Sequence, residues 1–260
     1  MENGCPYRAR TPLPVIASAM EIYFSGSSTA KTSRLLRKVL RVHRSDVAVW
    51  KWIVKYPSLA RDYTAALRAQ TSPTWHADET VIDTRVGKLW QWEVEDQDTR
   101  YILTSMMTGW GRESQHAVDL FAHAKAVGVR PERIVTDGLR AYVEGVRRNF
   151  YTNRANPRGP NGVKHVNRIH FAQADNNNLI ERFHGSVKER TKTLRHFKRA
   201  DTAKAILDGW IIAYNFLREH ESLGGLTPAV KAGIDLPFED GWGDLIRWAT
   251  YFRARVGQLS

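Results

Sequence analysis

Cysteine is nearly absent from the sequence, and long apolar runs are missing altogether. Cys5 is the only cysteine among the 260 residues, so a disulfide within the chain is impossible and a cysteine-rich zinc site is excluded. A single cysteine is typical of a reducing compartment. No run of about 18 apolar residues that could span a membrane occurs, and the N-terminus lacks the apolar centre of a signal peptide. We therefore expect a cytoplasmic protein with no membrane partner.

Acidic residues are too few to balance the basic ones. The chain has 39 Lys and Arg against 27 Asp and Glu, which gives a net charge of +12 and a pI near 9.9. This surplus favours polyanionic partners, nucleic acid first and an anionic membrane surface second, although a protein that is merely basic has the same composition. Hydrophobic residues make up 42% of the chain, so it folds, and its length allows one large core with a small accessory domain.

Residues 12–56 have the apolar spacing of helices. The stretches PVIASAMEIYF and SRLLRKVLRV each place apolar residues at helical intervals, and RSDVAVWKWIVKY follows them. Ser45 is suited to an N-cap, and Val47, Trp50 and Val54 fall on one side of the helix that it would begin. We predict three short helices in this region.

The last of these helices carries basic residues on a second face, at Lys51 and Lys55, with Arg44 just before its cap. Three short helices that end in a basic one suggest a helix-turn-helix unit that binds DNA through these three side chains. A plain three-helix packing cap is the alternative. The unit follows an N-terminal arm over residues 1–11 and precedes a connector over residues 57–74.

A strand-rich texture follows the helices. Residues 75–86, 89–96 and 99–109 are rich in β-branched and aromatic side chains, with a turn at Gly87 and Lys88, so they predict an antiparallel meander. Helices and strands then alternate in the order α-β-α-β-α-α, and we place these elements at residues 113–127, 133–138, 139–150, 166–173, 176–192 and 201–220.

This order is the one expected of an RNase H-like α/β fold. The prediction is a mixed five-stranded sheet flanked by helices, formed by residues 75–234 and preceded by the small all-α helix-turn-helix domain. Residues 235–260 include GWGDLIRWATYFRARV, which is aromatic and amphipathic. We expect this tail to pack on the core, with a subunit interface as the alternative.

Three acids stand out by their positions, because 27 acids in one chain make number alone uninformative. Asp78 lies in the first predicted strand, Asp137 at the carboxyl end of the fourth, and Glu181 in the first turn of a later helix. Sites in open α/β sheets collect at carboxyl strand ends, so these positions could bring the three carboxylates together. Glu79 and Asp83 compete with Asp78, while Asp137 also fits a turn and Glu181 a helix N-terminus.

Metal-dependent cleavage of a phosphodiester needs such a cluster. Charge builds on both the attacking and the leaving oxygen, and two divalent cations about 3.5–4 Å apart stabilise both. Mg²⁺ prefers oxygen ligands and is held by a few carboxylates together with substrate phosphate. The sequence has neither a Ser-His-Asp or Cys-His nucleophile motif nor a phosphate-binding GxxxxGK[ST] loop. The three acids would suffice to hold a pair of Mg²⁺ ions.

The helix that contains Glu181 has two distinct faces. Ile180, Phe183, Val187 and Leu194 form an apolar stripe, which is the ordinary core face. The side next to it presents one acid, then basic residues and a glycine that lets a backbone come close: Glu181, His184, Gly185, Lys188, Lys192 and Arg195. A solvated face usually mixes charges of both signs, and this one does not. The basic members of this face and Arg182 are therefore candidates for DNA contact.

A basic, acid-free segment precedes this helix. Residues 145–174 contain no Asp or Glu, and their Pro and Gly residues make the middle a loop. A basic loop beside a carboxylate cluster is suited to holding phosphates. Its cations are Arg147, Arg148, Arg154, Arg158, Lys164 and Arg168.

Five motifs occur in order along the chain, namely WHADET, GKLWQW, TDGLRAY, NNNLIERFHGSVKERTK and YNFLREHESLGGLTPAVKAG. Together they resemble the DDE transposases of prokaryotic insertion sequences, close to insertion-sequence family six and its archaeal relatives, over residues 12–234. That group shares an RNase H-like core with retroviral integrases.

The resemblance implies an activity and a set of residues. Such enzymes recognise the double-stranded ends of their own element, cut to leave 3′-hydroxyls, and join these to target DNA by direct transesterification with Mg²⁺ or Mn²⁺. The metal-binding catalytic acids would be Asp78 in ADET, Asp137 in TDG and Glu181 in IERFHG, and Lys188 matches a position of DNA contact near the scissile phosphate. The N-terminal helices match the region that binds the element's ends.

The family's reaction also implies assembly, because two DNA ends must be held together. We therefore expect a homodimer or a larger homo-oligomer on DNA, associated with the nucleoid. The interval from Asp137 to Glu181 is longer than is usual in the family, and Asp175 and Glu189 are the alternative third acids. A DNA-binding protein without catalysis and an RNase H-like nuclease or resolvase are the alternative functions.

Overall fold

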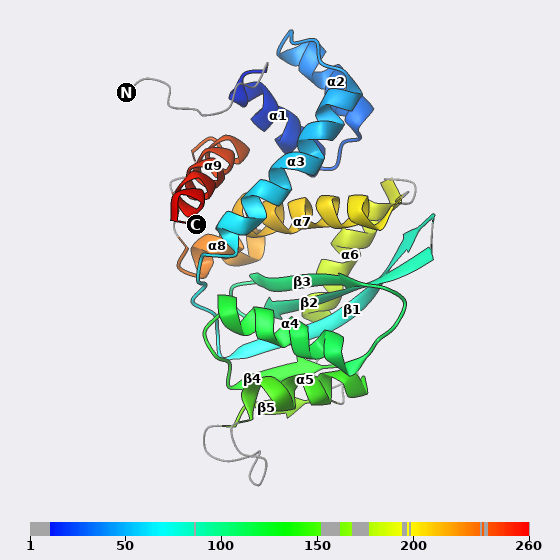
Figure 1. The fold of residues 1–260 in the computed structure, drawn as a ribbon, viewed down its shortest axis with the longest axis vertical. Coiled ribbons are helices and arrows are strands. Elements are labelled where there is room, and N and C mark those ends of the chain that lie inside the picture. Colours follow the sequence, from blue (N-terminus) through cyan, green and yellow to red (C-terminus); the bar gives the residue numbers. More distant parts are fainter. Residues whose placement is uncertain are drawn as a thin grey trace. The chain divides into compact units, whose positions relative to one another are not determined.

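The structure is a computed structural model of the chain, and it describes residues 11–85, 87–151, 162–167, 177–193, 197, 199–234, 236 and 239–259. The chain divides into two compact units (Figure 1). Residues 1–66, 204–213 and 236–260 belong to the first, which we call the helical unit. Residues 67–203 and 214–235 belong to the second, which we call the sheet unit. No helix among the described residues is long and apolar enough to cross a membrane.

The N-terminal part of the helical unit consists of the three predicted helices. They are α1 (Leu13–Phe24), α2 (Thr29–Val39) and α3 (Asp46–Thr64). The predicted cap of α3 is confirmed, since the Ser45 hydroxyl accepts a 3.1 Å hydrogen bond from the Ala48 N–H and so satisfies one of the free donors of the first turn.

The buried face of α3 is not the predicted one. Val47 is 57% exposed, and the side chains that enter the core are Val49, Ile53 and Tyr56. The helix also continues through Pro57 to Thr64, into the expected connector. A proline inside a helix removes one backbone hydrogen bond. Here the residues after it, Leu59, Ala60 and Tyr63 among them, are buried, and their packing offsets that loss.

The C-terminal tail forms α9 (Trp242–Leu259) and packs in the helical unit, as predicted for a tail that covers the core. Trp242 stacks on Phe24 of α1 with ring centroids 5.1 Å apart, and Phe252 contacts Tyr63 of α3. The middle of α7 (Ala200–Phe216) also lies in this unit. A Cβ at Gly209 would lie 2.4 Å from the Phe24 ring, so a glycine is needed for α7 to pass this close to α1.

The sheet unit is built on a mixed sheet of five strands, in the order β3-β2-β1-β4-β5. β1 pairs antiparallel with β2, and β2 pairs antiparallel with β3, whereas β4 is parallel to β1 and β5 is parallel to β4. This is the topology of the RNase H-like fold, and the predicted fold class is confirmed. The strands are β1 (Thr74–Thr84), β2 (Gly87–Asp96), β3 (Ile102–Thr108), β4 (Arg133–Thr136) and β5 (Lys164–Val166).

Two strand predictions need correction. We placed Gly87 and Lys88 in a turn, but they are the first residues of β2. Thr84 already pairs with Gly87, so the chain reverses between these two residues. The fifth strand begins at Lys164 and ends at Val166, before most of the expected span of 166–173. Residues 168–173 lie outside the described part of the chain.

Helices cover both faces of the sheet (Figure 1). Successive residues of β1 show this, since Glu79 bonds to a side chain of α5 (Arg140–Phe150) and Asp78 faces one of α6 (Asn178–Thr193). Between the sheet and the first pair of helices lies an aromatic core that includes Trp75, Trp92 and Phe121. The helices are α4 (Ser114–Val127), α5 (Arg140–Phe150) and α6 (Asn178–Thr193), and the short elements η1 (Glu221–Leu223) and α8 (Pro228–Lys231) follow α7.

Candidate active site

Asp78 and Asp137 are brought together by strand register. The parallel pairing of β1 with β4 ends at Ala77 and Thr136, and each strand's next residue is one of the two aspartates. Adjacent strands lie about 4.8 Å apart. Carboxylate oxygens of Asp78, Asp137 and Glu79 accordingly lie within 4.8 Å of one another. Two of the three acids predicted from the sequence thus meet where the short β4 ends and leaves β1 without a neighbour on that side.

Glu79 is the third member of this cluster, which we call the carboxylate cluster, and its oxygens are already engaged. Its Oε1 pairs with Arg112 at 2.9 Å, and its Oε2 accepts a 2.7 Å hydrogen bond from the Tyr142 hydroxyl. Its side chain is only 3% exposed, compared with 43% for Arg112. Both oxygens of Glu79 thus already have a partner, one of them on α5.

Glu181 lies in the first turn of α6 and is exposed. Among the described residues it is not a member of the carboxylate cluster. Its helix is nevertheless fixed to β1 on both sides of it, since the Asn177 amide donates to the Ala77 carbonyl at 3.4 Å and His184 lies beside Asp78. Residues four before and three after Glu181 therefore face β1, and helical geometry places Glu181 on the same side of α6.

His184 is not available for DNA contact as we predicted from its position on the helix. It is 4% exposed, its Nε2 lies 2.9 Å from Glu93 Oε2, and its Nδ1 lies 3.6 Å from Asp78 Oδ2. Burial lowers the pKa of His184, but the hydrogen bond to Glu93 and the charges of Glu93 and Asp78 outweigh it, so the pKa is raised. The imidazole holds Asp78 in place from the α6 side.

The pKa of Asp78 is raised to about 7, mainly by burial; the charge of His184 lowers it, and the charges of Glu79 and Asp137 contribute to the rise. Burial also raises the pKa of Glu79, with Asp137 adding to the effect. Several carboxylates crowded in one low-dielectric place disfavour their own ionised forms. A bound cation would reverse that preference, so this arrangement favours a divalent metal.

The donor set fits Mg²⁺ or Mn²⁺. Every candidate ligand atom is a carboxylate oxygen, the ligand type that hard divalent cations prefer. Asp137 Oδ1 accepts from the Leu139 N–H at 2.9 Å, which confirms the turn role considered above and orients the carboxylate. Among the described residues, the side chains placed to hold a metal together are those of Asp78, Asp137 and Glu79.

The remaining cations predicted on α6 have different outcomes. Lys188 and Arg182 are exposed on the helix. The side chain of Lys192 and the whole of Arg195 lie outside the described residues, as do most of the basic loop and the alternative acid Asp175. The apolar stripe is confirmed at Ile180, Phe183 and Val187, all of which are buried, and the other alternative acid, Glu189, is exposed.

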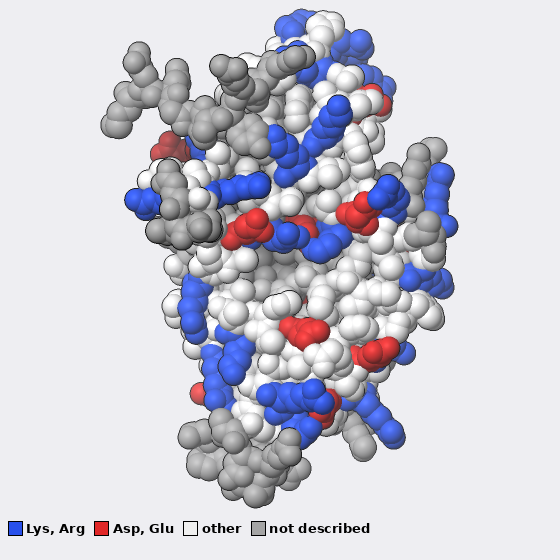
Figure 2. Space-filling view, in the orientation of Figure 1, with Lys and Arg blue, Asp and Glu red and all other residues white. Residues whose placement is uncertain are grey.

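In the helical unit, basic residues gather around α2 and the start of α3 (Figure 2). An open cavity there is lined by Ser33, Arg34, Arg37, His43, Arg44 and Ser45. Arg44 donates to Thr11 Oγ1 at 2.9 Å and to the His43 carbonyl at 2.8 Å, so its guanidinium is already held in place within the unit. Lys51 and Lys55 are exposed on α3.

A mixed sheet of this order with acids where β1 and β4 part defines an RNase H-like domain with a carboxylate cluster. The family model described as a DDE domain, of the IS240 transposase type, matches residues 72–220. This is more than half of the chain, so the chain belongs to that family. No curated protein matches the chain.

Solved structures similar to the chain include viral and transposon enzymes. The magnesium complex of the HTLV-2 integrase catalytic core domain, in its trimeric form, is 18% identical with a TM-score of 0.47, covering 64% of this chain and 99% of that one. A simian T-cell lymphotropic virus intasome in complex with PP2A regulatory subunit B56 gamma is 14% identical (TM-score 0.42, covering 78% and 70%). The Mos1 mariner transposase catalytic domain is 12% identical (TM-score 0.40, covering 94% and 96%).

Proposed function

We propose that this chain is a transposase that cuts DNA at the ends of an insertion sequence and joins the freed 3′-hydroxyls to target DNA. The observation that carries the proposal is the placement of Asp78 and Asp137 side by side where the pairing of β1 with β4 ends. Membership of the DDE-domain family supports the same activity. The family resemblance further suggests a member close to insertion-sequence family six, of archaeal kinship.

Two Mg²⁺ or Mn²⁺ ions held by Asp78, Asp137 and Glu181 would stabilise charge on the attacking and leaving oxygens of the phosphodiester. The chain's own groups prepare that place. His184 and Glu93 fix Asp78 from one face of the sheet, and the Leu139 N–H fixes Asp137. Cations on and just after α6 would hold the phosphates on either side of the scissile bond. Lys188 and Arg182 are exposed on the helix, and Lys192 and Arg195 are the further candidates from the sequence, with side chains outside the described residues.

The helical unit supplies recognition of the element's ends in this proposal. Lys51, Lys55 and Arg44 lie on or next to α3, the helix that a helix-turn-helix unit would place in the major groove. Joining two ends to one target needs two active sites, so the partners are double-stranded DNA and further copies of this chain.

The proposal is tested by incubating the protein with Mg²⁺ and a labelled end of its own element. Strand transfer supports it, cleavage without joining would indicate a nuclease or resolvase, and binding alone would indicate a DNA-binding protein without catalysis. Asp137→Ala should abolish the chemistry and leave DNA affinity nearly intact. Asp83→Ala is the matched control, because Asp83 is an exposed acid on the same sheet and should tolerate the change. Equal loss of chemistry and affinity in Asp137→Ala would count against a metal role.

A further inference from the structure

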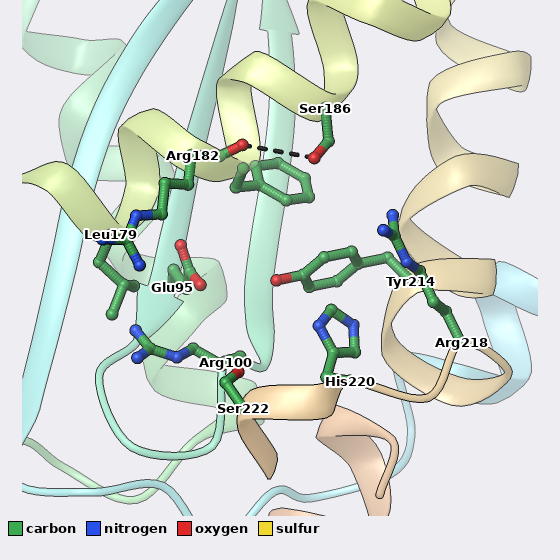
Figure 3. A pocket seen from close by; sticks show the side chains of 10 residues that line it. Glu95, Arg100, Leu179, Arg182, Ser186, Tyr214, Arg218, His220 and Ser222 are labelled. Carbon is green, nitrogen blue, oxygen red and sulfur yellow. Dashed lines mark hydrogen bonds between the residues drawn. The ribbon is translucent and has the colours of Figure 1, made fainter. Parts of the chain in front are cut away.

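A second cavity lies in the sheet unit on another face of α6 (Figure 3). Leu179, Arg182, Phe183 and Ser186 line it from α6, and their spacing of three and four residues makes them one helical face. Glu181 lies on the face next to it. The cavity has a volume of ≈ 180 Å³, and it is completed by Glu95 and Arg100 from the end of β2 and the turn after it and by Tyr214, Arg218, His220 and Ser222.

The cavity is rich in positive charge, with three arginines and one acid, Glu95, among its lining residues. Among the described residues, no ion pair joins Arg100, Arg182 or Arg218 to a carboxylate. Figure 3 shows the guanidinium groups of Arg100 and Arg182 on one side of Glu95 and that of Arg218 on the other side, beyond Tyr214. Cations spread along a cavity in this way match a chain of anionic groups better than a single ion.

Two buried polar atoms that line the cavity also lack partners. Glu95 is 1% exposed, and neither its Oε2 nor the His220 Nε2 has a hydrogen-bond partner among the described residues. Burying such atoms without a bond costs free energy, so they mark a place where a ligand supplies the missing partners. Burial raises the pKa of Glu95 well above its usual range, and the charge of Arg100 opposes this effect.

Arg100 occupies a strained backbone position. Its φ is 61°, a left-handed conformation that favours glycine or asparagine. The turn that holds it is organised by Asp96, whose carboxylate accepts bonds from Thr99 and Ser72 and whose carbonyl accepts from the Arg100 N–H at 3.1 Å. Backbone strain of this kind is kept where the side chain has a function at that position. The side chain of Arg100 lines the cavity, so its function is there.

We propose that this cavity binds backbone phosphates of the DNA strand that crosses α6 beside the carboxylate cluster. The ligand class is the phosphodiester, held by Arg100, Arg182 and Arg218, with the Tyr214 hydroxyl as a further donor to phosphate oxygens. Asn215 fixes Tyr214 next to it, because its side chain accepts from the Ile102 N–H and donates to the Ile102 carbonyl, each at 2.9 Å. This inference rests on the proposed function, since it takes the partner to be DNA.

The test measures DNA binding in EDTA, where no chemistry occurs. Arg182→Gln and Arg218→Gln should each weaken binding about 10-fold and lower the salt dependence of binding by about one counterion. Arg199→Gln is the matched control, since Arg199 is exposed, lies outside the cavity and pairs with Asp201 at 2.7 Å. Unchanged affinity and salt slope in both cavity variants would overturn the proposal. A failed strand-transfer assay would leave this result untouched, so the two failures are distinguishable.

Two further experiments test which molecule supplies the phosphate and what the strained backbone of Arg100 contributes. Titration of the DNA-free protein with inorganic phosphate and with a deoxynucleoside monophosphate should show no tight saturable binding. Micromolar binding of either, lost in Arg182→Gln while DNA affinity stays constant, would make the cavity a small-molecule site and overturn the proposal. Arg100→Gly relieves the backbone strain and removes the guanidinium, so thermal stability should hold or rise while DNA affinity falls about 10-fold. Unchanged affinity in this variant would also contradict the proposal.

Discussion

Asp78 on β1 stands directly opposite Glu93 on β2 in the antiparallel ladder. Two acids in this relation repel each other, and the pair is kept because the imidazole of His184 inserts beside both. Glu93 is fully buried and also accepts from the Ser105 hydroxyl at 3.3 Å. His184 thereby ties α6 to β1 through Asp78 and to β2 through Glu93.

Replacing this histidine should affect both stability and metal binding. His184→Ala leaves the Glu93 carboxylate with an unfilled acceptor, which costs about 1–3 kcal/mol of unfolding free energy. It also removes the positive charge that lowers the pKa of Asp78, so that pKa should rise above its value of about 7. Mg²⁺ or Mn²⁺ binding should then require a higher pH than in the wild type. Calorimetric titration across pH checks this, with the exposed His123→Ala as control. An unshifted pH profile would show that His184 has a packing role only.

Substitutions of Glu181 and Glu79 should have different effects on stability and on strand transfer. Glu181→Gln changes an exposed residue, so stability should stay within about 0.5 kcal/mol while strand transfer is lost. Glu79→Gln breaks the buried ion pair with Arg112 and weakens the bond from Tyr142, so unfolding free energy should fall by about 1–3 kcal/mol. Chemical denaturation and the strand-transfer assay measure both effects. If Glu181→Gln remains fully active, Glu79 rather than Glu181 completes the metal site.

Much of the sheet unit could be predicted, because the sequence patterns that define its strands and helices are local. Alternating side chains and short turns define β1 to β3, and a short apolar run that ends at Asp137 defines β4. Once β1 and β4 are parallel neighbours, register alone brings Asp78 to Asp137. The apolar stripe of α6 is likewise a property of its own sequence.

The predictions that proved wrong concern features that are set by contacts between distant segments of the chain. A helical wheel places His184 with Glu181, but how far burial extends around α6 is set by β1 and β2, which lie about ninety residues earlier. The buried face of α3 is set by its packing against α1, α2 and α9, so the side that carries Val47 is exposed and Val49 is buried instead. Glu93 was not predicted as a site residue. Its sequence signal is weak, since it is one acid between apolar residues of a strand, opposite the candidate ligand Asp78.

Stability should fall in mild acid partly through His165. Burial lowers the pKa of this imidazole to about 4, below the unfolded value of 6.5. The unfolded chain therefore binds the proton first, and the contribution of His165 is complete above pH 6.5 and is lost as pH falls toward about 4. Since the group is partly exposed, the loss should be on the order of 1 kcal/mol. Denaturant unfolding at several pH values should show a smaller acid loss in His165→Gln than in the wild type. Parallel curves would mean that His165 titrates alike in both states.

Gly185 offers a test of how closely DNA approaches α6. A Cβ at this exposed helical position would meet no described atom within 4 Å, so nothing in the protein's own packing calls for glycine. Gly185→Ala should raise the unfolding free energy by about 0.5–1 kcal/mol, since alanine is the better helix former. If a DNA backbone passes against this face, the added methyl group should weaken DNA binding while the fold becomes more stable. Gly257→Ala is the control, because Gly257 is an exposed glycine of α9 where an added Cβ also meets no described atom within 4 Å. Stability and affinity that rise together would place the DNA elsewhere.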